Sequence, residues 1–460
     1  MRVVTVKSPE QQGELLRKFV RKGSRASITK LLGKVRSEDV AVAFRGLTPA
    51  ERVEVFRMLA LDFPESAADV LAELDSPLRL SLLERLEPNE VASLLDRMPV
   101  DDQVFVIESL PEELQPAVLE LMGVEHLSDV QGQLTFEEDT AGRIMTREYF
   151  ALPETTTVRE AVAAIQEHRE LELIVYLYVL DTEGRLVGVM SLRQLLLARP
   201  SKTLGEVMTR DVITVHTDTD QEEVAQLATR YDLLAIPVVD SDQALMGIVT
   251  YDDIVDVVRE EATEDFYKLA GTSDEEIVYQ ERSFKVAWIR FPWLLVNLAG
   301  GVLTGLLLEH FQVRLEEALF LLTFVPVIMG MGGNVGTQTS TIAVRGLATG
   351  RIRLGEGSTR QFLWRQLKVG VLLGIACATV VAVAAAVLQQ NPMYSAVVGC
   401  AMMIALVLAS LNGATIPILF ERLGVDPAIA SGPLVTTSND ITGILIYFGL
   451  ASALIELLVR

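Results

Sequence analysis

One carboxylate, Asp440, lies inside the last long apolar stretch of the chain, directly after Thr436-Thr-Ser-Asn. An ionised side chain in the middle of a membrane span costs at least about 2.5 kcal/mol. A nearby Lys or Arg could offset that cost, but none of the long uncharged stretches contains one. Asp440 is therefore predicted to be a cation site or a proton relay.

Neutral oxygens surround this carboxylate in the sequence. Gly432, Thr436 and Asp440 are spaced by four residues, which puts them on one face of a helix. A second stretch, from Pro326 to Thr341, holds four glycines and a polar group that includes Asn334. We expect these glycines to interrupt the helix, which is tolerated at membrane depth only where backbone lines a cavity. Few carboxylates among many neutral oxygens suit Mg²⁺, which gives up its water reluctantly. Close helix packing is an equally good explanation for each Gly or Thr taken singly.

A second group of carboxylates precedes the membrane part and is spaced as on one continuous helix. Its members are Asp252, Asp253, Asp256, Glu260, Glu261, Glu264 and Asp265. Like charges three or four residues apart destabilise a helix, and divalent cations would relieve the repulsion. A solvated acidic face is the ordinary alternative, and the sequence leaves it open.

Charge divides the chain into two chemically different parts. Residues 1–281 hold 54 of the 62 acidic side chains and 28 of the 40 basic ones. This acidic excess argues against nucleic acid as a partner, because phosphate contacts need Lys and Arg. The two cysteines lie in apolar stretches and form no metal or redox framework. The N-terminal residues carry no apolar run typical of a signal peptide, so we expect the acidic part to stay in the cytosol.

The remainder of the chain is long and apolar enough for five membrane spans. Uncharged stretches cover residues 291–308, 318–344 and 369–420, the last being two spans joined by a hairpin at Gln389-Gln-Asn-Pro392. The fifth span is expected from about Pro427 to Ile455. Basic residues gather before the first span, between the second and third, and between the fourth and fifth. The positive-inside rule therefore predicts a cytosolic N-terminal part and an outside C-terminus.

Two internal repeats organise the acidic part. Leu74, Leu86, Met98 and Leu110 each begin a Pro- or acid-containing helix start at a constant step of 12 residues, which predicts a superhelix of short helices. The segments beginning at Met145-Thr-Arg and Met208-Thr-Arg repeat the order strand, helix, strand, strand, helix. The first repeat's buried strand is expected over 174–180. That order is the layout of a paired CBS module, which usually binds adenine nucleotides or ions, although two packing repeats without a ligand remain possible.

These features together resemble the MgtE family of magnesium channels over nearly the whole chain. The most specific motifs are Gly332-Gly-Asn-Val-Gly-Thr-Gln and Gly424-Val-Asp-Pro-Ala followed by Asp440-Ile-Thr-Gly. The resemblance implies a multidomain homodimeric membrane protein with four parts: an all-α superhelical N domain (1–137), an α/β CBS pair (138–258, as repeats of about 145–207 and 208–258), a connecting "plug" helix (259–286), and a five-helix all-α transmembrane domain (287–460).

The resemblance also implies roles for individual residues. By the resemblance, Asp440 is the pore metal site; Gly432, Thr436 and Asn334 join it as candidates on the spacing and polarity described above. Regulatory Mg²⁺ would bind Asp253, Asp256, Glu261, Glu264, Asp265, Glu222, Asp232 and Asp426, together with the N-domain residues Asp96, Asp101 and Asp102. The expected function is Mg²⁺ import through the cell membrane down its electrochemical gradient, closed by cytosolic Mg²⁺ bound between the N domain, the CBS pair and the plug. ATP is a further candidate ligand of the CBS pair.

Two rival functions remain. One is import of another divalent ion such as Co²⁺, Mn²⁺ or Zn²⁺, against which the absence of His and Cys near Asp440 argues. The other is a nucleotide-sensing membrane protein without transport, which would leave Asp440 without a task. An enzyme is not expected, because the sequence shows no nucleophile, base and metal constellation.

Overall fold

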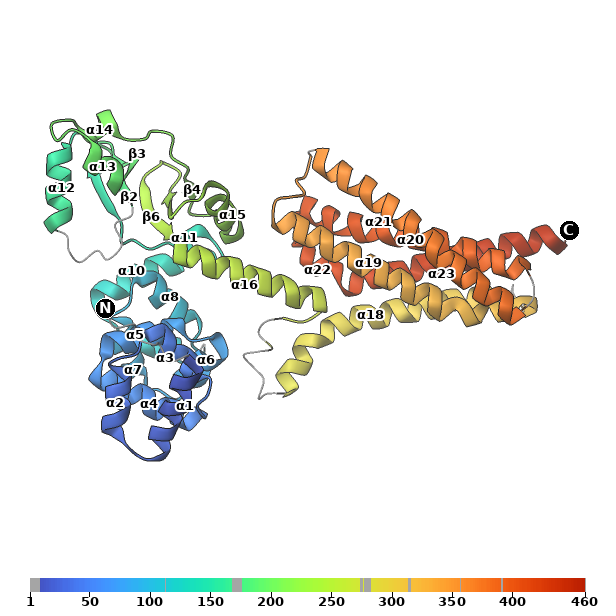
Figure 1. The fold of residues 1–460 in the computed structure, drawn as a ribbon, viewed down its shortest axis with the longest axis horizontal. Coiled ribbons are helices and arrows are strands. Elements are labelled where there is room, and N and C mark those ends of the chain that lie inside the picture. Colours follow the sequence, from blue (N-terminus) through green and yellow to red (C-terminus); the bar gives the residue numbers. More distant parts are fainter. Residues whose placement is uncertain are drawn as a thin grey trace. The chain divides into compact units, whose positions relative to one another are not determined.

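A computed structural model describes residues 9–111, 113–167, 176–273, 276, 283–312, 316–355, 357–389 and 392–459. The chain divides into two units, Met1–Arg259 and Glu260–Arg460, with the boundary inside helix α16. Each unit is described below by itself (Figure 1).

The first unit begins with a superhelix of short helices. Three of them, α6 (Ser76–Leu83), α7 (Pro88–Leu95) and α8 (Val100–Glu108), begin 12 residues apart, as the sequence predicts. The fourth predicted step, at Leu110, is wrong, because the next helix begins at Gln115. The others are α1 (Pro9–Arg21), α2 (Arg25–Leu32), α3 (Ser37–Phe44), α4 (Pro49–Asp62), α5 (Pro64–Glu73), α9 (Gln115–Leu119) and α10 (Val124–Leu134). Helix α5 contacts α3, α7 and α8, so successive turns of the superhelix share one apolar core. The predicted all-α superhelical domain is confirmed.

Two three-stranded sheets follow. The first contains β1 (Phe150–Pro153), β2 (Tyr176–Leu180) and β3 (Leu186–Ser191), and the second contains β4 (Val215–His216), β5 (Ala235–Val239) and β6 (Leu245–Thr250). In both, the first two strands are parallel and the last two antiparallel. The accompanying helices are α11 (Ala141–Ile144), α12 (Val158–Glu167), α13 (Leu192–Leu197), α14 (Leu204–Val207), α15 (Gln221–Tyr231) and α16 (Tyr251–Ala270). The predicted paired CBS layout is confirmed; residues 174 and 175 of the expected first buried strand lie outside the described residues.

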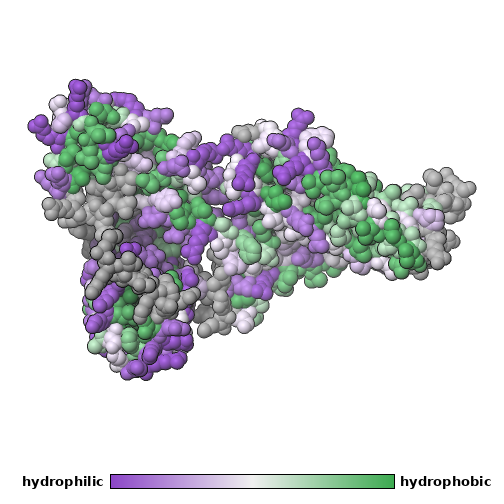
Figure 2. Space-filling view, viewed as in Figure 1, coloured by the Kyte–Doolittle hydropathy of each residue, from purple (hydrophilic) through white to green (hydrophobic). Residues whose placement is uncertain are grey.

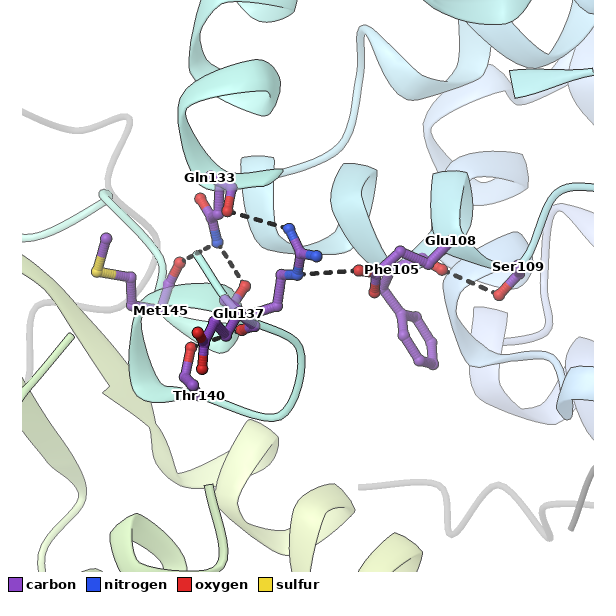
Figure 3. A network of polar contacts seen from close by, with 8 residues as sticks. Phe105, Glu108, Ser109, Gln133, Glu137, Thr140 and Met145 are labelled. Carbon is purple, nitrogen blue, oxygen red and sulfur yellow. Dashed lines mark hydrogen bonds and ion pairs between the residues drawn. The ribbon is translucent and has the colours of Figure 1, made fainter. Parts of the chain in front are cut away.

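A polar network ties the superhelix to the CBS pair within this unit (Figure 3). Gln133 at the end of α10 donates its amide to the carbonyls of Arg143 and Met145, at 2.8 and 2.7 Å. Arg143 pairs in turn with Glu108 at the end of α8, with Nε and Oε1 3.0 Å apart. Because Gln133 is fully buried, these bonds resist competition from water and hold α8 beside the start of the CBS pair.

Helix α16 differs from the predicted connecting helix of residues 259–286. It begins at Tyr251, directly after β6, and ends at Ala270. Gly271 then adopts a φ of +73°, and the Thr272 N–H donates to the Tyr267 carbonyl, as in a glycine-terminated helix. The expected continuation was wrong at this glycine; residues 274, 275 and 277–282 lie outside the described residues.

In the second unit, five helices of the described residues are long and apolar enough to cross a membrane. They are α18 (Ser283–Gln312), α19 (Val325–Ala348), α20 (Gly357–Gln389), α21 (Pro392–Arg422) and α23 (Pro433–Val459), with a 3-10 segment η1 (Glu316–Phe324) and the short α22 (Pro427–Ser431) between them. On the face drawn in Figure 2, patches of hydrophobic residues cover much of the surface along these helices, with hydrophilic residues between them. Helix α21 is central, contacting α19, α20 and α23. The five predicted spans are confirmed; Gln390 and Asn391 of the predicted hairpin lie outside the described residues.

Two details of these spans differ from expectation. The glycine-rich segment Pro326–Thr341 does not interrupt its helix, since α19 is continuous from Val325 to Ala348. Its glycines instead allow close approach: a Cβ added to Gly413 of α21 would lie 2.3 Å from the Gly336 carbonyl oxygen.

The fifth span is not one helix from Pro427, because α22 and α23 are separated at Gly432. Pro433 disfavours the helical conformation in the residue before it, and Gly432 has φ −77° and ψ −101°. Gly432 therefore lies at a helix break and not on a regular helical face with Thr436 and Asp440.

Candidate functional site

Asp440 lies on α23 as a half-buried carboxylate. One turn earlier, Thr436 donates from its N–H and from Oγ1 to the carbonyl of Gly432, at 3.2 and 3.1 Å. That carbonyl oxygen is thus already bonded, although each carbonyl can accept a second partner. Among the described residues, no three His, Cys, Asp or Glu side chains gather as a metal site. Asp440 accordingly offers a single carboxylate, which favours contact with a hydrated cation over full protein coordination.

Helix α19 brings polar groups to the same part of the unit. A Cβ on Gly333 would lie 3.4 Å from Thr436 Cγ2, so α19 and α23 are packed together at this level. The side chains of Asn334, Thr337 and Gln338 are exposed on α19. Exposed polar groups in the middle of a membrane helix are costly against lipid and are expected beside water or another protein chain.

A charged cluster forms where α16 meets the loop before α22, inside the second unit. Lys268 Nζ lies 2.6 Å from Asp426 Oδ2 and 2.5 Å from Glu264 Oε1. Burial disfavours the charged amine, but the hydrogen bonds to these two carboxylates raise the Lys268 pKa overall. Burial, followed by the charge of Asp426, raises the pKa of the neighbouring Asp265 to about 6. Asp426 also caps α22 by accepting from the Ala428 N–H at 2.7 Å.

Lys268 was missed by sequence reasoning. The predicted ligands Glu264, Asp265 and Asp426 do come together, but around an ammonium group of this chain. Its position one turn after Glu264 and Asp265 marks Lys268 as a local partner of these carboxylates, but nothing near it in the sequence points to Asp426.

A second acidic cluster lies in the first unit, between α8 and the start of α16. Burial, followed by the charges of Asp253 and Asp102, raises the pKa of Asp101 well above its ordinary value. Asp101 Oδ1 is buried and has no hydrogen-bond partner among the described residues. Burial raises the pKa of Asp253 to about 7 against the opposing hydrogen bonds from Thr250, and Asp252 adds repulsion. The structure thus places two predicted N-domain residues beside a predicted α16 residue.

The same cluster extends to Asp102 and to an unpredicted residue, Glu73 at the end of α5. Burial raises the pKa of Asp102 to about 6, opposed by Arg79 and reinforced by Glu73. Burial, followed by the charge of Asp256, raises the pKa of Glu73. Nothing in the local sequence around Glu73 marks it, because its neighbours are brought close only by the superhelix.

The other predicted ligands have different surroundings. Asp96 accepts from the Gly123 N–H at 3.1 Å and so joins two parts of the superhelix. Glu222 lies in the first turn of α15, and Asp232 ends that helix with φ +53°. Glu261 lies on α16 between the two clusters. Their roles as metal ligands remain predictions.

Comparison with known proteins follows the same division of the chain. A family model for the divalent cation transporter MgtE matches residues 325–450. A model for the MgtE intracellular N domain matches 35–139, and CBS domain models match 141–201 and 204–260.

Characterised relatives extend the match to nearly full length. The magnesium transporter MgtE of Bacillus subtilis is 34% identical over 439 residues, which cover 95% of this chain and 96% of the relative. That of Thermus thermophilus is 40% identical over 339 residues, covering 73% and 75%. A crystal structure of the cytosolic domain of the Mg²⁺ channel MgtE in complex with ATP has 33% identity and a TM-score of 0.50, covering 53% of this chain and 99% of that one. By these matches the chain belongs to the MgtE family of magnesium transporters.

Proposed function

We propose that this chain forms a channel for Mg²⁺ whose ion path passes Asp440 and which cytosolic Mg²⁺ closes. The observation that carries the proposal is the isolated carboxylate of Asp440 on an otherwise uncharged stretch of α23. A single charge surrounded by hydroxyl and carbonyl oxygens attracts a divalent ion without stripping its water, so the ion can also leave.

The exposed polar residues of α19 support a pore shared by two copies of the chain. Asn334, Thr337 and Gln338 are exposed in the single chain, and facing them toward lipid would be unfavourable. Placing α19 and α23 of two copies around a two-fold axis gives these groups a water-filled path. The proposed assembly is therefore a homodimer in the cell membrane.

The carboxylate cluster between α8 and the start of α16 supplies the proposed regulation. When no cation is present, burial destabilises the charged forms of Asp101 and Asp253. The charge of Asp253 adds to this at Asp101, and the charges of Asp252 and Asp102 add to it at Asp253. Mg²⁺ bound between Asp101 and Asp253 would stabilise the arrangement in which α8 lies beside α16, and a ligand shifts an equilibrium by its differential affinity for the two states. Loss of cytosolic Mg²⁺ then favours separation of these carboxylates, which releases the plug formed by α16.

The CBS pair is the proposed site of a second regulator, ATP. The similar cytosolic domain that was crystallised with ATP matches 53% of this chain, which supports this assignment. Basic residues gather in the first turns of α18 and from the last turn of α19 into the start of α20. This favours a cytosolic location for the first unit, with the C-terminus outside. The inside-negative membrane potential, about 2.3 kcal/mol per charge per 100 mV, then drives Mg²⁺ inward.

The test is Mg²⁺ uptake by proteoliposomes that contain the full chain with Asp440→Ala. We expect uptake to be abolished while the protein elutes and melts as the unmodified protein does. Glu309→Gln removes an exposed carboxylate near the end of α18 and is the matched control. Normal uptake by Asp440→Ala would refute the pore site. Equal uptake of Co²⁺ or Mn²⁺ in competition would instead support import of other divalent ions.

A further inference from the structure

Asn439, the residue directly before Asp440, is almost completely buried, with 3% of its surface exposed. Its side chain joins three membrane helices. Asn412 of α21 donates from Nδ2 to Asn439 Oδ1 at 3.2 Å, and Asn439 donates from Nδ2 to the Gly332 carbonyl of α19 at 3.4 Å. A buried amide in a membrane is expensive unless both its ends are bonded, so these partners determine where Asn439 can lie.

Glycines provide the space for this amide. A Cβ added to Gly336 of α19 would lie 1.9 Å from Asn439 Nδ2, a distance that no side chain permits. The Gly336 backbone is itself in close contact with Gly413 of α21, the residue next to Asn412. The glycine-rich segment of α19 therefore forms the recess that receives Asn439.

We propose that Asn439 and Asn412 are positioning residues for Asp440, fixing the rotation of α23 so that the carboxylate faces the ion path. This inference rests on the proposed function of Asp440. Successive residues of an α-helix point about 100° apart, so holding Asn439 between α19 and α21 directs Asp440 out of that buried contact. Rotating Asp440 out of the path would break both amide hydrogen bonds and move Asn439 out of the recess at Gly336.

The experiment uses the full chain in proteoliposomes, with initial Mg²⁺ uptake measured against external Mg²⁺ concentration. Asn412→Ala removes the donor to Asn439 and leaves Asp440 intact. The matched control is Ser410→Ala on the same helix, where the buried Ser410 Oγ donates to the Gln366 carbonyl at 3.0 Å without touching Asn439. Asn412→Gln keeps an amide donor at this position and tests for recovery of the contact. If Asn412→Ala does not fold, Asn412→Gln is the variant to be measured in its place.

We expect Asn412→Ala to raise the half-saturating Mg²⁺ concentration about three- to tenfold, the effect of one lost hydrogen bond on the bound ion. Ser410→Ala should leave the half-saturating Mg²⁺ concentration unchanged, even if it lowers the melting temperature as much as Asn412→Ala does. Asn412→Gln should recover most of the loss. If both alanine variants shift half-saturation equally, or if neither does, the positioning role is refuted. Asp440→Ala distinguishes the positioning role from the proposed pore site. Full Mg²⁺ uptake by Asp440→Ala would overturn the pore site. If Asp440→Ala is inactive but Asn412→Ala keeps the half-saturating Mg²⁺ concentration of the unmodified protein, only the positioning role is overturned.

Discussion

Replacing Asp253 with Asn tests whether the charged carboxylates between α8 and α16 destabilise the fold in the absence of metal. The Asp253 pKa of about 7 compares with an ordinary value of 3.8, and burial is its main cause. Because this pKa is raised, the folded protein holds a proton that the unfolded chain has lost between pH 4 and 7. The free energy of unfolding of the metal-free protein therefore falls as the pH rises through that interval, and the loss is complete above pH 7.

The size of the effect follows from the same shift. Three pKa units correspond to about 4 kcal/mol as an upper limit. Asp253 is only half-buried, so solvent screening reduces this limit, and we expect the Asp253→Asn substitution to stabilise the metal-free first unit by about 2 kcal/mol at pH 7.5. The neutral amide retains an acceptor for the Thr250 N–H, so the substitution removes charge and little else. For a unit of this size, the melting temperature should rise by roughly 4–8 °C.

The assay is thermal unfolding of the full chain in detergent with a chelator, followed by far-ultraviolet circular dichroism at pH 4.5 and 7.5. All three tryptophans, Trp288, Trp293 and Trp364, lie in the membrane part, so their fluorescence reports its unfolding separately. Asp211→Asn, at an exposed position, changes the net charge equally and is the control. The reasoning fails if Asp253→Asn raises the melting temperature by the same amount at pH 4.5 as at pH 7.5. It also fails if Asp211→Asn raises the melting temperature as much as Asp253→Asn does. Mg²⁺ should raise the melting temperature of the unmodified protein more than that of Asp253→Asn.

Three further substitutions probe other contacts. Arg79→Met should lower the free energy of unfolding of the superhelix by about 3 kcal/mol, as measured by denaturant melts. The buried Arg79 side chain donates to the Leu74 carbonyl at 2.6 Å and to Ser109 Oγ at 2.9 Å, and its guanidinium lies 4.0 Å from the centre of the Phe105 ring. Lys268→Gln should increase channel opening in patch recordings at nominally zero cytosolic Mg²⁺, since it removes the ammonium that pairs with Asp426 and Glu264; unchanged opening would count against that contact. Gly336→Ala should lower both uptake and the melting temperature in detergent, whereas Gly301→Ala, where an added Cβ meets nothing within 4 Å, should be tolerated.

Patterns that depend on neighbours along the chain were predictable. The 12-residue step gave the starts of α6, α7 and α8 because Pro or an acidic residue marks each one locally. The order of strands and helices in the CBS pair and the number of spans likewise follow from periodicity and apolar length.

Features that depend on a distant partner were not predictable. The glycines of α19 look like helix breakers in isolation, but Gly336 is needed because Asn439 and Gly413 lie against it. Lys268 looks like one basic residue on an acidic helix, and its importance comes from Asp426, 158 residues later. Glu73 joins the acidic cluster only because the superhelix turns α5 toward α8. In each case the sequence supplies the side chain, and tertiary packing decides which charge or cavity it meets.

The number of carboxylates at each site distinguishes the proposed pore site at Asp440 from the proposed regulatory site around Asp101 and Asp253. At Asp440 one charge acts within an apolar stretch, and a divalent ion held by a single carboxylate through its water can dissociate quickly enough for conduction. Around Asp101 and Asp253 several carboxylates repel one another at short range, so an ion that neutralises them gains the relief of that repulsion in addition to direct attraction. The crowded site is therefore expected to bind Mg²⁺ more tightly than the solitary one. That order is what a sensor requires, since it must be occupied at cytosolic concentrations while the pore exchanges its ion.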